Sequence, residues 1–422
     1  MEYDLLPQTS RLAGHISGER LWERLMALAG FGALPGGGVN RQALSQEEIA
    51  ARAEIVRWAK PLGLVPSTDP AANLFLRLPG QDESLAPVLV GSHIDSQPTG
   101  GKFDGAYGFL AGFEAVEAIR SAGIQPPRSI DVVAWMNEEG SRFAPGMMGS
   151  AVFSGARQLA DIYPVKDSSG VPVKTALDEV LRANPSLPVR SFGWKPHAFL
   201  EAHIEQGPIL ELEGKTIGVV SGIQGKRTFR VEVVGEENHA GTSPRAVRRD
   251  ALVAAINIVH AIQNALWDKD DIVRCTVGMF TVSPNAPSVV PARVVFSIDL
   301  RHPDSRTLTR LGNLVAPLCQ EHRLRCEVNT RELLHDPPLE FPKQIRDKLT
   351  KISNALGISN IEIASGAGHD ARYLHYICPT AMIFIPCKAG ISHNEAESIE
   401  KEHAVAGARV LAEAVFDLAN AE

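Results

Sequence analysis

The chain has 422 residues, 44% of them hydrophobic and 22% charged, as is usual for a folded globular protein, and this length predicts two domains. The formal charge of −7 argues against a nucleic-acid partner, because binding to a phosphate backbone needs a basic surface. Five scattered cysteines, an N-terminus without an uninterrupted apolar core and no apolar run near the ~18 residues that cross a bilayer favour a cytoplasmic protein with no membrane partner.

The first part of the chain alternates helical and strand patterns. Helical spacing of apolar residues, with a Ser-x-x-Glu capping box at Ser45–Glu48, predicts helices at residues 19–29, 45–60 and 108–122. Apolar runs predict strands at residues 73–78, 88–90 and 129–136. After residue 338 the alternation resumes, with helices at 344–356 and 402–420 and strands at 361–364 and 381–385. We therefore predict an α/β fold with a mixed, mostly parallel sheet and helices on both faces.

The middle of the chain has a different pattern. Residues 227–234 alternate polar and apolar side chains, as a half-exposed antiparallel strand does. Further strands are predicted at 272–282, 293–300 and 325–330, and helices at 250–266 and 305–322. We therefore predict a smaller α+β domain at 222–335, inserted into a discontinuous domain formed by 1–221 and 336–422. An outer strand or helix of the insertion could pair with a second copy of the chain.

Four polar clusters fall at or near the predicted strand ends, where ligands bind in open α/β sheets. They are His93/Asp95/Asp104, Glu138/Glu139, His203/Glu205/Gln206 and Ser392/His393. Taken alone, each cluster is more typical of an ordinary loop: a single histidine is usually a surface or core residue, and a Glu-Glu-Gly segment is usually a solvated helix start. Four clusters at equivalent strand ends favour a functional site instead.

Together the clusters offer three imidazoles and several carboxylates, a ligand set that suits zinc, with manganese, cobalt or nickel as substitutes. The set is large enough for two metal ions that share a bridging carboxylate. Glu138 and Glu139 point in different directions, so one can bind metal while the other acts as a general base. Asp95 can accept a hydrogen bond from the second ring nitrogen of His93. Glycines around Asp104 allow it to converge with His93.

Seven motifs, in order and over nearly the whole chain, resemble the amidase/hydantoinase-carbamoylase branch of the dinuclear zinc peptidases. They are GSHIDSQPTGGKFDG, NEEGSRF, EAHIEQGP, NHAGTSP, FSIDLRHPD, SGAGHDA and MIFIPCKAGISHNEAE. This branch includes N-carbamoyl-L-amino acid hydrolases, β-ureidopropionases and allantoate amidohydrolases.

The resemblance implies a role for each matching residue. Glu138 resembles the general base, and Asp95 resembles the residue that orients a metal-binding histidine. The residues that resemble metal ligands, with Asp104 as the bridge, are His93, Asp104, Glu139, His203 and His393. The resemblance also implies a zinc-peptidase-like catalytic domain and an inserted dimerisation or lid domain that closes over substrate, hinged near Ser221–Gly222 and Asp336–Pro337.

Substrate contacts are implied as well. Gln206 and His369 match positions that contact substrate in the family, and Arg301 resembles the clamp for a substrate carboxylate, a task that suits its planar fork of donors. His239 resembles a residue that reaches the partner subunit's active site and stabilises an oxyanion, which requires a homodimer with a shared active site. The simpler alternatives are a surface arginine after a strand and a loop histidine before a glycine turn.

Three positions depart from the family pattern. Ser288 stands where the family has an asparagine that helps bind the substrate carboxylate, and the nearby Asn285 could compensate. Arg245 replaces a methionine, and Glu395 replaces a proline after the last predicted ligand. The departures lie on the substrate side, while the predicted metal ligands are intact.

The resemblance implies hydrolysis of the ureido C–N bond of an N-carbamoyl-L-amino acid or of β-ureidopropionate, small molecules with a free carboxylate. An allantoate or ureidoglycolate amidohydrolase would have the same metal residues. A dipeptidase or aminoacylase fits less well, because HIEQG and GAGHDA belong to the ureido-cleaving branch. A metal-dependent binding protein that has lost catalysis is a further alternative, which Ser288 raises and the intact Glu138 opposes.

Overall fold

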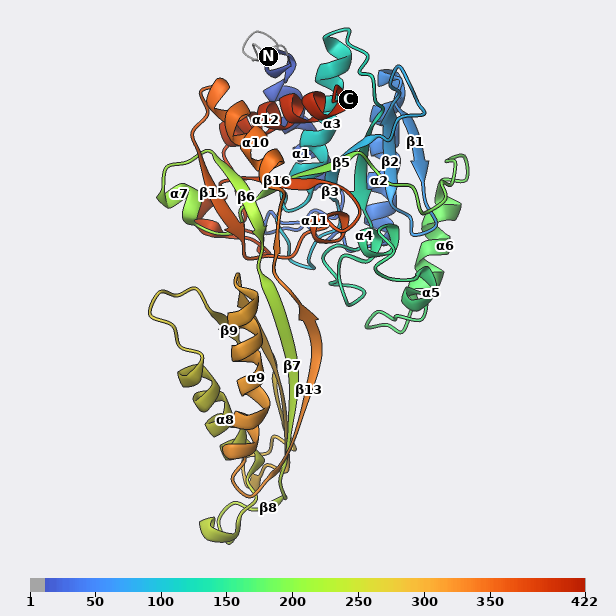
Figure 1. Cartoon of the computed structure of the whole chain (residues 1–422). Helices are drawn as coiled ribbons and strands as arrows, with labels where there is room; N and C mark the ends of the chain where they lie inside the picture. Colours follow the sequence, from blue (N-terminus) through green and yellow to red (C-terminus); the bar gives the residue numbers. More distant parts are fainter. Residues whose placement is uncertain (1–11, 422) are drawn as a thin grey trace. The chain divides into compact units, whose positions relative to one another are not determined.

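The computed structural model describes residues 12–421 (Figure 1). The expectation about the N-terminus falls partly on residues 1–11, outside this range. Among the described residues, no helix combines the length and apolar character that a membrane span requires. The described residues form two compact units: a larger one of residues 12–221, 341–363 and 368–421, and a smaller one of residues 222–340 and 364–367. The predicted insertion, 222–335, lies within the smaller unit.

The larger unit is built on a mixed sheet with a parallel centre. The four central strands, all parallel, are β4 (Ile130–Trp135), β3 (Val88–His93), β5 (Ala198–Ile204) and β16 (Thr380–Ile385). Antiparallel strands flank them: β2 (Leu74–Leu78) and β1 (Val65–Thr68) beside β4, and β6 (Ile217–Ile223) beside β16. A further strand, β15 (Asn360–Ser365), pairs with β6. The predicted α/β class with a mixed sheet is confirmed.

Helices cover both faces of this sheet, so every residue of β3, β4, β5 and β16 is buried. One face packs against α3 (Ala106–Ser121) and α12 (Lys401–Ala419), which α1 (Gly18–Ala29) and α10 (Lys343–Ala355) contact in turn. The other face carries the short helices α4 (Met148–Phe153) and α11 (Ala371–Leu374). The remaining helices of this unit are α2 (Gln46–Ala59), α5 (Leu159–Ile162), α6 (Val173–Ala183) and α7 (Ile209–Leu212), with 3₁₀ turns at Ala13–His15, Lys60–Leu62 and Lys388–Gly390.

The predicted capping box is partly present at the start of α2. The Ser45 hydroxyl accepts a hydrogen bond from the Glu48 amide at 3.2 Å, as predicted. The Glu48 carboxylate, however, binds the amide of Leu44 rather than that of Ser45. The box therefore satisfies the amide one residue further from the helix.

The smaller unit is an antiparallel sheet with helices α8 (Ala251–Ala265) and α9 (Ser305–Glu321) side by side on one face (Figure 1). The strand order is β10 (Phe280–Ser283), β12 (Arg293–His302), β7 (Gly225–Val234) and β13 (Glu327–Asp336). A separate pair joins β8 (Asn238–His239) to β11 (Val289–Val290), β14 (Leu339–Glu340) pairs with the end of β6, and a 3₁₀ turn covers Arg245–Val247. Alternate residues of β7 and β12 are buried, which explains the alternating sequence.

The strand predicted at 272–282 is wrong in one respect. It is two short strands, β9 (Arg274–Thr276) and β10, that both pair with β12. Thr276 pairs with Asp299 and Phe280 with Phe296, so four steps on one strand face three on the other. The extra residue bulges around Gly278 and interrupts the ladder.

Candidate metal centre

The predicted ligands come from one edge of the central sheet. His93 is the last residue of β3, and His203 is the last but one of β5. Glu138 and Glu139 follow β4, and His393 lies in the loop after β16. Because these four strands are parallel, their carboxyl ends lie at the same edge of the sheet.

Asp104 lies between two groups of these side chains. Its Oδ1 is 3.5 Å from Nε2 of His93 and 3.1 Å from Nε2 of His203. Its Oδ2 is 3.3 Å from Nε2 of His393, and that nitrogen is 3.2 Å from Glu139. The groups His93/Asp104/His203 and Asp104/Glu139/His393 each have their donor atoms within 4.8 Å of one another, as a metal site requires. The structure thus brings together all five predicted ligands, with Asp104 common to both groups.

The electrostatics of this cluster suit cations. Burial alone would raise the pKa of Asp104, but the imidazoles of His203, His393 and His93 hold it well below its usual range. Hydrogen bonds to Asp104 and Glu139 raise the pKa of His393 to about 10. The negative charge of the carboxylates therefore stabilises positive charge at the positions where metal ions would bind. Imidazole nitrogens and carboxylate oxygens also form a suitable donor set for zinc.

Backbone carbonyls fix the ring nitrogens that face away from the cluster. Nδ1 of His93 lies 3.0 Å from the backbone oxygen of Asp95, and Nδ1 of His203 lies 2.9 Å from that of Ile204. With Nδ1 held by a backbone oxygen, each ring directs Nε2 toward the centre, where Nε2 of His203 also lies 3.2 Å from the amide of Gly105.

The predicted side-chain hydrogen bond from His93 to Asp95 is absent. The Asp95 carboxylate is 3.6 Å from Nδ1 of His93, too far for a hydrogen bond, and the backbone oxygen takes that role. Its two oxygens instead accept the amides of Glu138 and Glu139, both at 3.2 Å. Asp95 therefore shapes the turn that carries the two glutamates, and burial raises its pKa to about 7.

The two glutamates point in different directions, as predicted. Glu139 faces His393 and accepts hydrogen bonds from the amide and side chain of Gln97, at 3.2 and 2.7 Å. Glu138 belongs to neither of the three-donor groups found among the described residues. Its carboxylate lies 3.6 Å from Nε2 of His93, and burial raises its pKa well above the usual range. It is a free carboxylate at the rim of the cluster.

Two predicted substrate residues lie beside the centre. Gln206 donates from Nε2 to Asp104 at 2.8 Å and to Ser392 at 3.2 Å, while its Oε1 is buried and has no hydrogen-bond partner among the described residues. The ring of His369 is buried 4.6 Å from that of His203, measured between centroids. Gln206 is thus closer to the predicted metal ligands than a purely substrate-facing residue would be.

The other predicted substrate residues lie in the smaller unit, in two separate places. Arg301, near the end of β12, donates to Asp299 at 2.9 and 3.2 Å and to the carbonyl of Gly366 at 2.7 Å. His239 and Ser288 lie beside the other end of β12, where the amide of Ala240 donates to the Ser288 carbonyl at 3.0 Å.

The separation of these two places follows from the length of β12. This strand begins at Arg293, three residues after β11, so Arg301 is eight residues further along it. At ~3.3 Å per residue the two ends of the strand are about 26 Å apart. Asn285, a residue with positive φ in the loop between β10 and β11, belongs to the end that carries His239.

Some residues that shape the centre are absent from the predictions. Buried Arg41 donates to the carbonyl of Ile94 at 2.7 Å and so supports the loop after β3. Glu201 and Glu397 are buried and accept hydrogen bonds from segments next to predicted ligands. The available signal was an acidic residue inside the apolar run AFLEAHI and another shortly after the last histidine.

Backbone geometry also marks this region. Gly105 has φ +64, and a Cβ at this position would lie 2.3 Å from the His93 ring, so only glycine fits. Asn137, Gln206 and His393 adopt the left-handed conformation that non-glycine residues rarely accept. Such strain is typical of functional sites.

The parallel centre of the mixed sheet thus carries two three-donor groups that share Asp104, with Glu138 beside them, an arrangement that suits a metal-dependent enzyme. Residues 89–417 match the sequence profile of Peptidase family M20/M25/M40, and the chain belongs to this family. The resemblance found in the sequence is therefore confirmed, and with it the metal dependence of the family.

The similarity to known proteins extends over almost the whole chain. An N-carbamoyl-L-amino-acid amidohydrolase of Rhizobium meliloti is 38% identical over 417 residues, which cover 96% of this chain and 97% of the relative. An allantoate amidohydrolase of Bacillus subtilis is 33% identical over 396 residues, with 93% and 95% covered. The crystal structure of an amidase of the hydantoinase/carbamoylase family from Burkholderia multivorans has 41% identity and a TM-score of 0.87, with 96% and 98% covered.

Proposed function

We propose that this chain hydrolyses the ureido C–N bond of N-carbamoyl-L-amino acids, or of β-ureidopropionate, to an amino acid, ammonia and carbon dioxide. The observation that carries this proposal is the free carboxylate of Glu138 beside two three-donor groups. Identities of 38% and 35% to two N-carbamoyl-L-amino-acid amidohydrolases support the substrate class.

Two divalent ions, zinc in preference to manganese, cobalt or nickel, would be held by His93, Asp104 and His203 and by Asp104, Glu139 and His393. When bound, such ions make a water molecule more acidic and polarise the carbonyl group under attack. The donor atoms of each group lie within 4.8 Å of one another.

Glu138 acts as the general base in this proposal. It takes a proton from the attacking water, and the oxygen forms a bond to the ureido carbonyl carbon. Glu138 then returns the proton to the leaving amine nitrogen as the C–N bond breaks. The products are the amino acid and carbamate, and carbamate decomposes to ammonia and carbon dioxide. Asp95 positions Glu138 through the amide hydrogen bond described above.

Substrate recognition would use residues of both units. The unpartnered Oε1 of Gln206 can accept a hydrogen bond from a ureido N–H, and His369 provides a second polar contact. Arg301 uses donors for Asp299 and Gly366, and its remaining N–H groups can bind the substrate carboxylate. His239 would donate to the oxyanion from Nε2, because its Nδ1 accepts the amides of Gly241 and Thr242.

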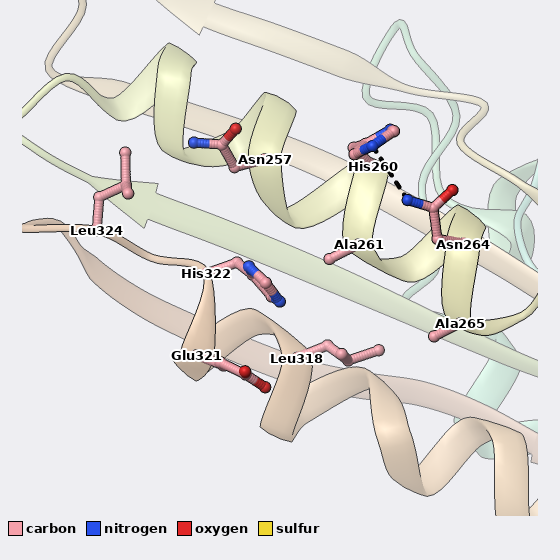
Figure 2. Close-up of a pocket in the computed structure, with 9 residues that line it drawn as sticks. All are labelled: Asn257, His260, Ala261, Asn264, Ala265, Leu318, Glu321, His322 and Leu324. Carbon is pink, nitrogen blue, oxygen red and sulfur yellow. Dashed lines mark hydrogen bonds between the residues drawn. The ribbon is translucent and has the colours of Figure 1, made fainter.

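A homodimer with a shared active site explains the two separate places in the smaller unit. Along β12, about 26 Å separate Arg301 from Arg293, which lies at the end that carries His239. A ureido amino acid is far shorter than this, so one smaller unit cannot offer both ends of the strand to one substrate. We propose that the partner supplies one of them. Exposed apolar side chains on α8, Val253 and Ile256, support pairing through this unit, together with a pocket lined by α8 and the C-terminal part of α9 (Figure 2).

We also propose that the two units close over substrate, with hinges near Ser221–Gly222 and Asp336–Pro337.

We propose a cytoplasmic location as well. The five cysteines are all unpaired, as is usual in a reducing compartment.

The second candidate function is hydrolysis of allantoate. Allantoate amidohydrolases of two bacteria are 33% and 35% identical to this chain. Ser288, which departs from the family pattern, stands at a position that is predicted to contact substrate. A panel of N-carbamoyl-L-amino acids, β-ureidopropionate, allantoate and N-acyl amino acids, assayed with zinc and with manganese for ammonia release, tests both functions. Ammonia from allantoate alone would favour the second candidate, and release from no ureido compound would refute the proposal.

A further inference from the structure

Two buried glutamates lie behind the candidate metal centre, Glu201 and Glu397, which are 0% and 5% exposed. Neither belongs to the two three-donor groups found among the described residues. Burial of a carboxylate is costly unless hydrogen bonds compensate, so its partners indicate what it stabilises.

Glu201 connects the segments that carry three histidines. It lies on β5, two residues before His203. Its Oε1 accepts the hydroxyl of Ser92 at 2.7 Å, and Ser92 precedes His93. Its Oε2 accepts the amide of Ala371 at 3.0 Å, two residues after His369. One carboxylate therefore fixes β3 and the start of α11 relative to β5.

Glu397 performs the equivalent task at the other group. Its Oε1 accepts the amides of Phe103 and Asp104, at 2.8 and 3.1 Å. Its Oε2 lies 3.0 Å from the hydroxyl of Ser392, which is 2.9 Å from Asp104 and precedes His393. A Cβ at Gly101 would lie 2.0 Å from the Glu397 carboxyl group, so the loop leaves no space for a side chain there.

We infer that Glu201 and Glu397 are positioning residues that hold the two halves of the metal centre separately: Glu201 the His93/His203 half, and Glu397 the Asp104/His393 half. The inference rests on the proposed metal ligands. It distinguishes these glutamates from Glu413 on α12, which is also buried and accepts two amides, those of Leu12 and Ala13, but in a segment that carries no predicted ligand.

The test compares zinc retention by Glu201→Ala, Glu397→Ala and the control Glu413→Ala, after dialysis of the full chain against a graded series of chelator concentrations. Zinc per chain is measured by mass spectrometry, and the melting temperature of each metal-free protein is recorded. We expect the unaltered protein and Glu413→Ala to retain two zinc ions. Loss of a supporting residue weakens metal affinity about 10–100-fold. Glu201→Ala should therefore lose one zinc ion at a low chelator concentration. Glu397→Ala should lower the zinc affinity of both donor groups, because Asp104 belongs to both.

The variants Glu201→Gln and Glu397→Gln provide the rescue. A carboxamide oxygen can still accept the backbone amides, and its nitrogen can donate to the serine hydroxyl, so both variants should retain two zinc ions. Where Glu201→Ala does not fold, Ser92→Ala removes one hydrogen bond to Glu201 and should lower affinity by a smaller factor. Where Glu397→Ala does not fold, Ser392→Ala removes the contacts of this hydroxyl to Glu397 and to Asp104 and should also lower affinity.

The outcomes separate this inference from the proposed function. An unaltered protein that binds no zinc contradicts both. Two zinc ions in the unaltered protein and unchanged retention in the alanine variants refute the positioning role alone. The positioning role is also refuted if Glu201→Ala and Glu397→Ala lose no more zinc than Glu413→Ala does. It is likewise refuted if the glutamine variants retain as little zinc as the alanine variants.

Discussion

The predicted functional residues of the larger unit and those of the smaller unit are held in different ways. In the larger unit His93 and His203 are 1% exposed, and backbone oxygens hold their Nδ1 atoms. In the smaller unit His239 lies exposed on a two-residue strand, and Arg301 is held on a sheet by an aspartate and one carbonyl. The first arrangement is mostly buried, although the His393 side chain is 50% exposed, while His239 in the second is exposed.

This difference indicates a division of tasks. Metal binding and proton transfer need fixed geometry, which the rigid centre of a parallel sheet provides. Residues that contact substrate can lie on a separate unit and act when the substrate or a second chain is present. Substitutions in the larger unit should therefore affect catalysis and metal content most, and substitutions in the smaller unit should affect recognition.

The largest effect is expected for Glu138→Gln. The amide cannot accept a proton from water, so kcat should fall by about 10²–10⁴-fold, the range for loss of a general base. Glu138 is outside both ligand groups, so zinc per chain should stay at two. Glu139→Gln is the matched control and should lose metal. If Glu138→Gln loses zinc and Glu139→Gln does not, the two glutamates have the opposite roles.

The next effect tests the shared active site. His239→Ala should lower kcat by about 10²–10³-fold, as loss of an oxyanion donor does. The His239→Ala and Glu138→Gln proteins are then mixed in equal amounts, dissociated and allowed to reassemble. Half of the resulting dimers should be hybrids with one unaltered site. Activity should then recover to roughly a quarter of that of the unaltered protein, by the arithmetic of random pairing. No recovery, with hybrids shown by a tag on one chain, would mean that His239 serves its own chain.

Arg301→Ala should raise KM by about 10–100-fold, because a charge-assisted hydrogen bond to the substrate carboxylate is lost, with a smaller change in kcat. Arg293→Ala is the control at the other end of the same strand, where the guanidinium is bound to Glu232 at 2.6 Å. Its KM should stay within twofold. Steady-state kinetics on one N-carbamoyl-L-amino acid measure both, and equal effects would remove the special role of Arg301.

Much of the centre could be predicted from the sequence, because most of its ligands lie at or just after predicted strands, and parallel strands end at one edge of a sheet. The supporting residues could not. Glu397 binds amides 293 and 294 positions away, and Glu201 binds Ser92 across 109 positions, contacts that no local pattern reports. The sequence also predicts the wrong acceptor for Nδ1 of His93, which is 3.0 Å from the backbone oxygen of Asp95 and 3.6 Å from its carboxylate. A difference this small cannot be predicted from the sequence.

In the smaller unit the sequence predicted the elements but not their consequences. The alternation of polar and apolar residues at 227–234 predicted β7, whereas the bulge around Gly278 has no comparable signal in the sequence. The wide separation of Arg301 from His239 follows from the register of a ten-residue strand, which the motifs alone do not contain.

The smallest effect is expected for Ser288→Asn. The Ser288 backbone carbonyl, not its side chain, binds Ala240, so the substitution should leave the β8–β11 pair intact. The longer amide side chain adds a donor that can reach a substrate carboxylate from the His239 end. We expect kcat/KM for N-carbamoyl-L-amino acids to rise about three- to tenfold, the gain from one added hydrogen bond. Ser186→Asn, in an exposed loop of the larger unit, is the control and should change nothing. The opposite result would be a lower kcat/KM for N-carbamoyl-L-amino acids in Ser288→Asn, with an unaltered protein that hydrolyses allantoate faster than N-carbamoyl-L-amino acids. That result would mean that the serine suits this end of the unit to a different substrate.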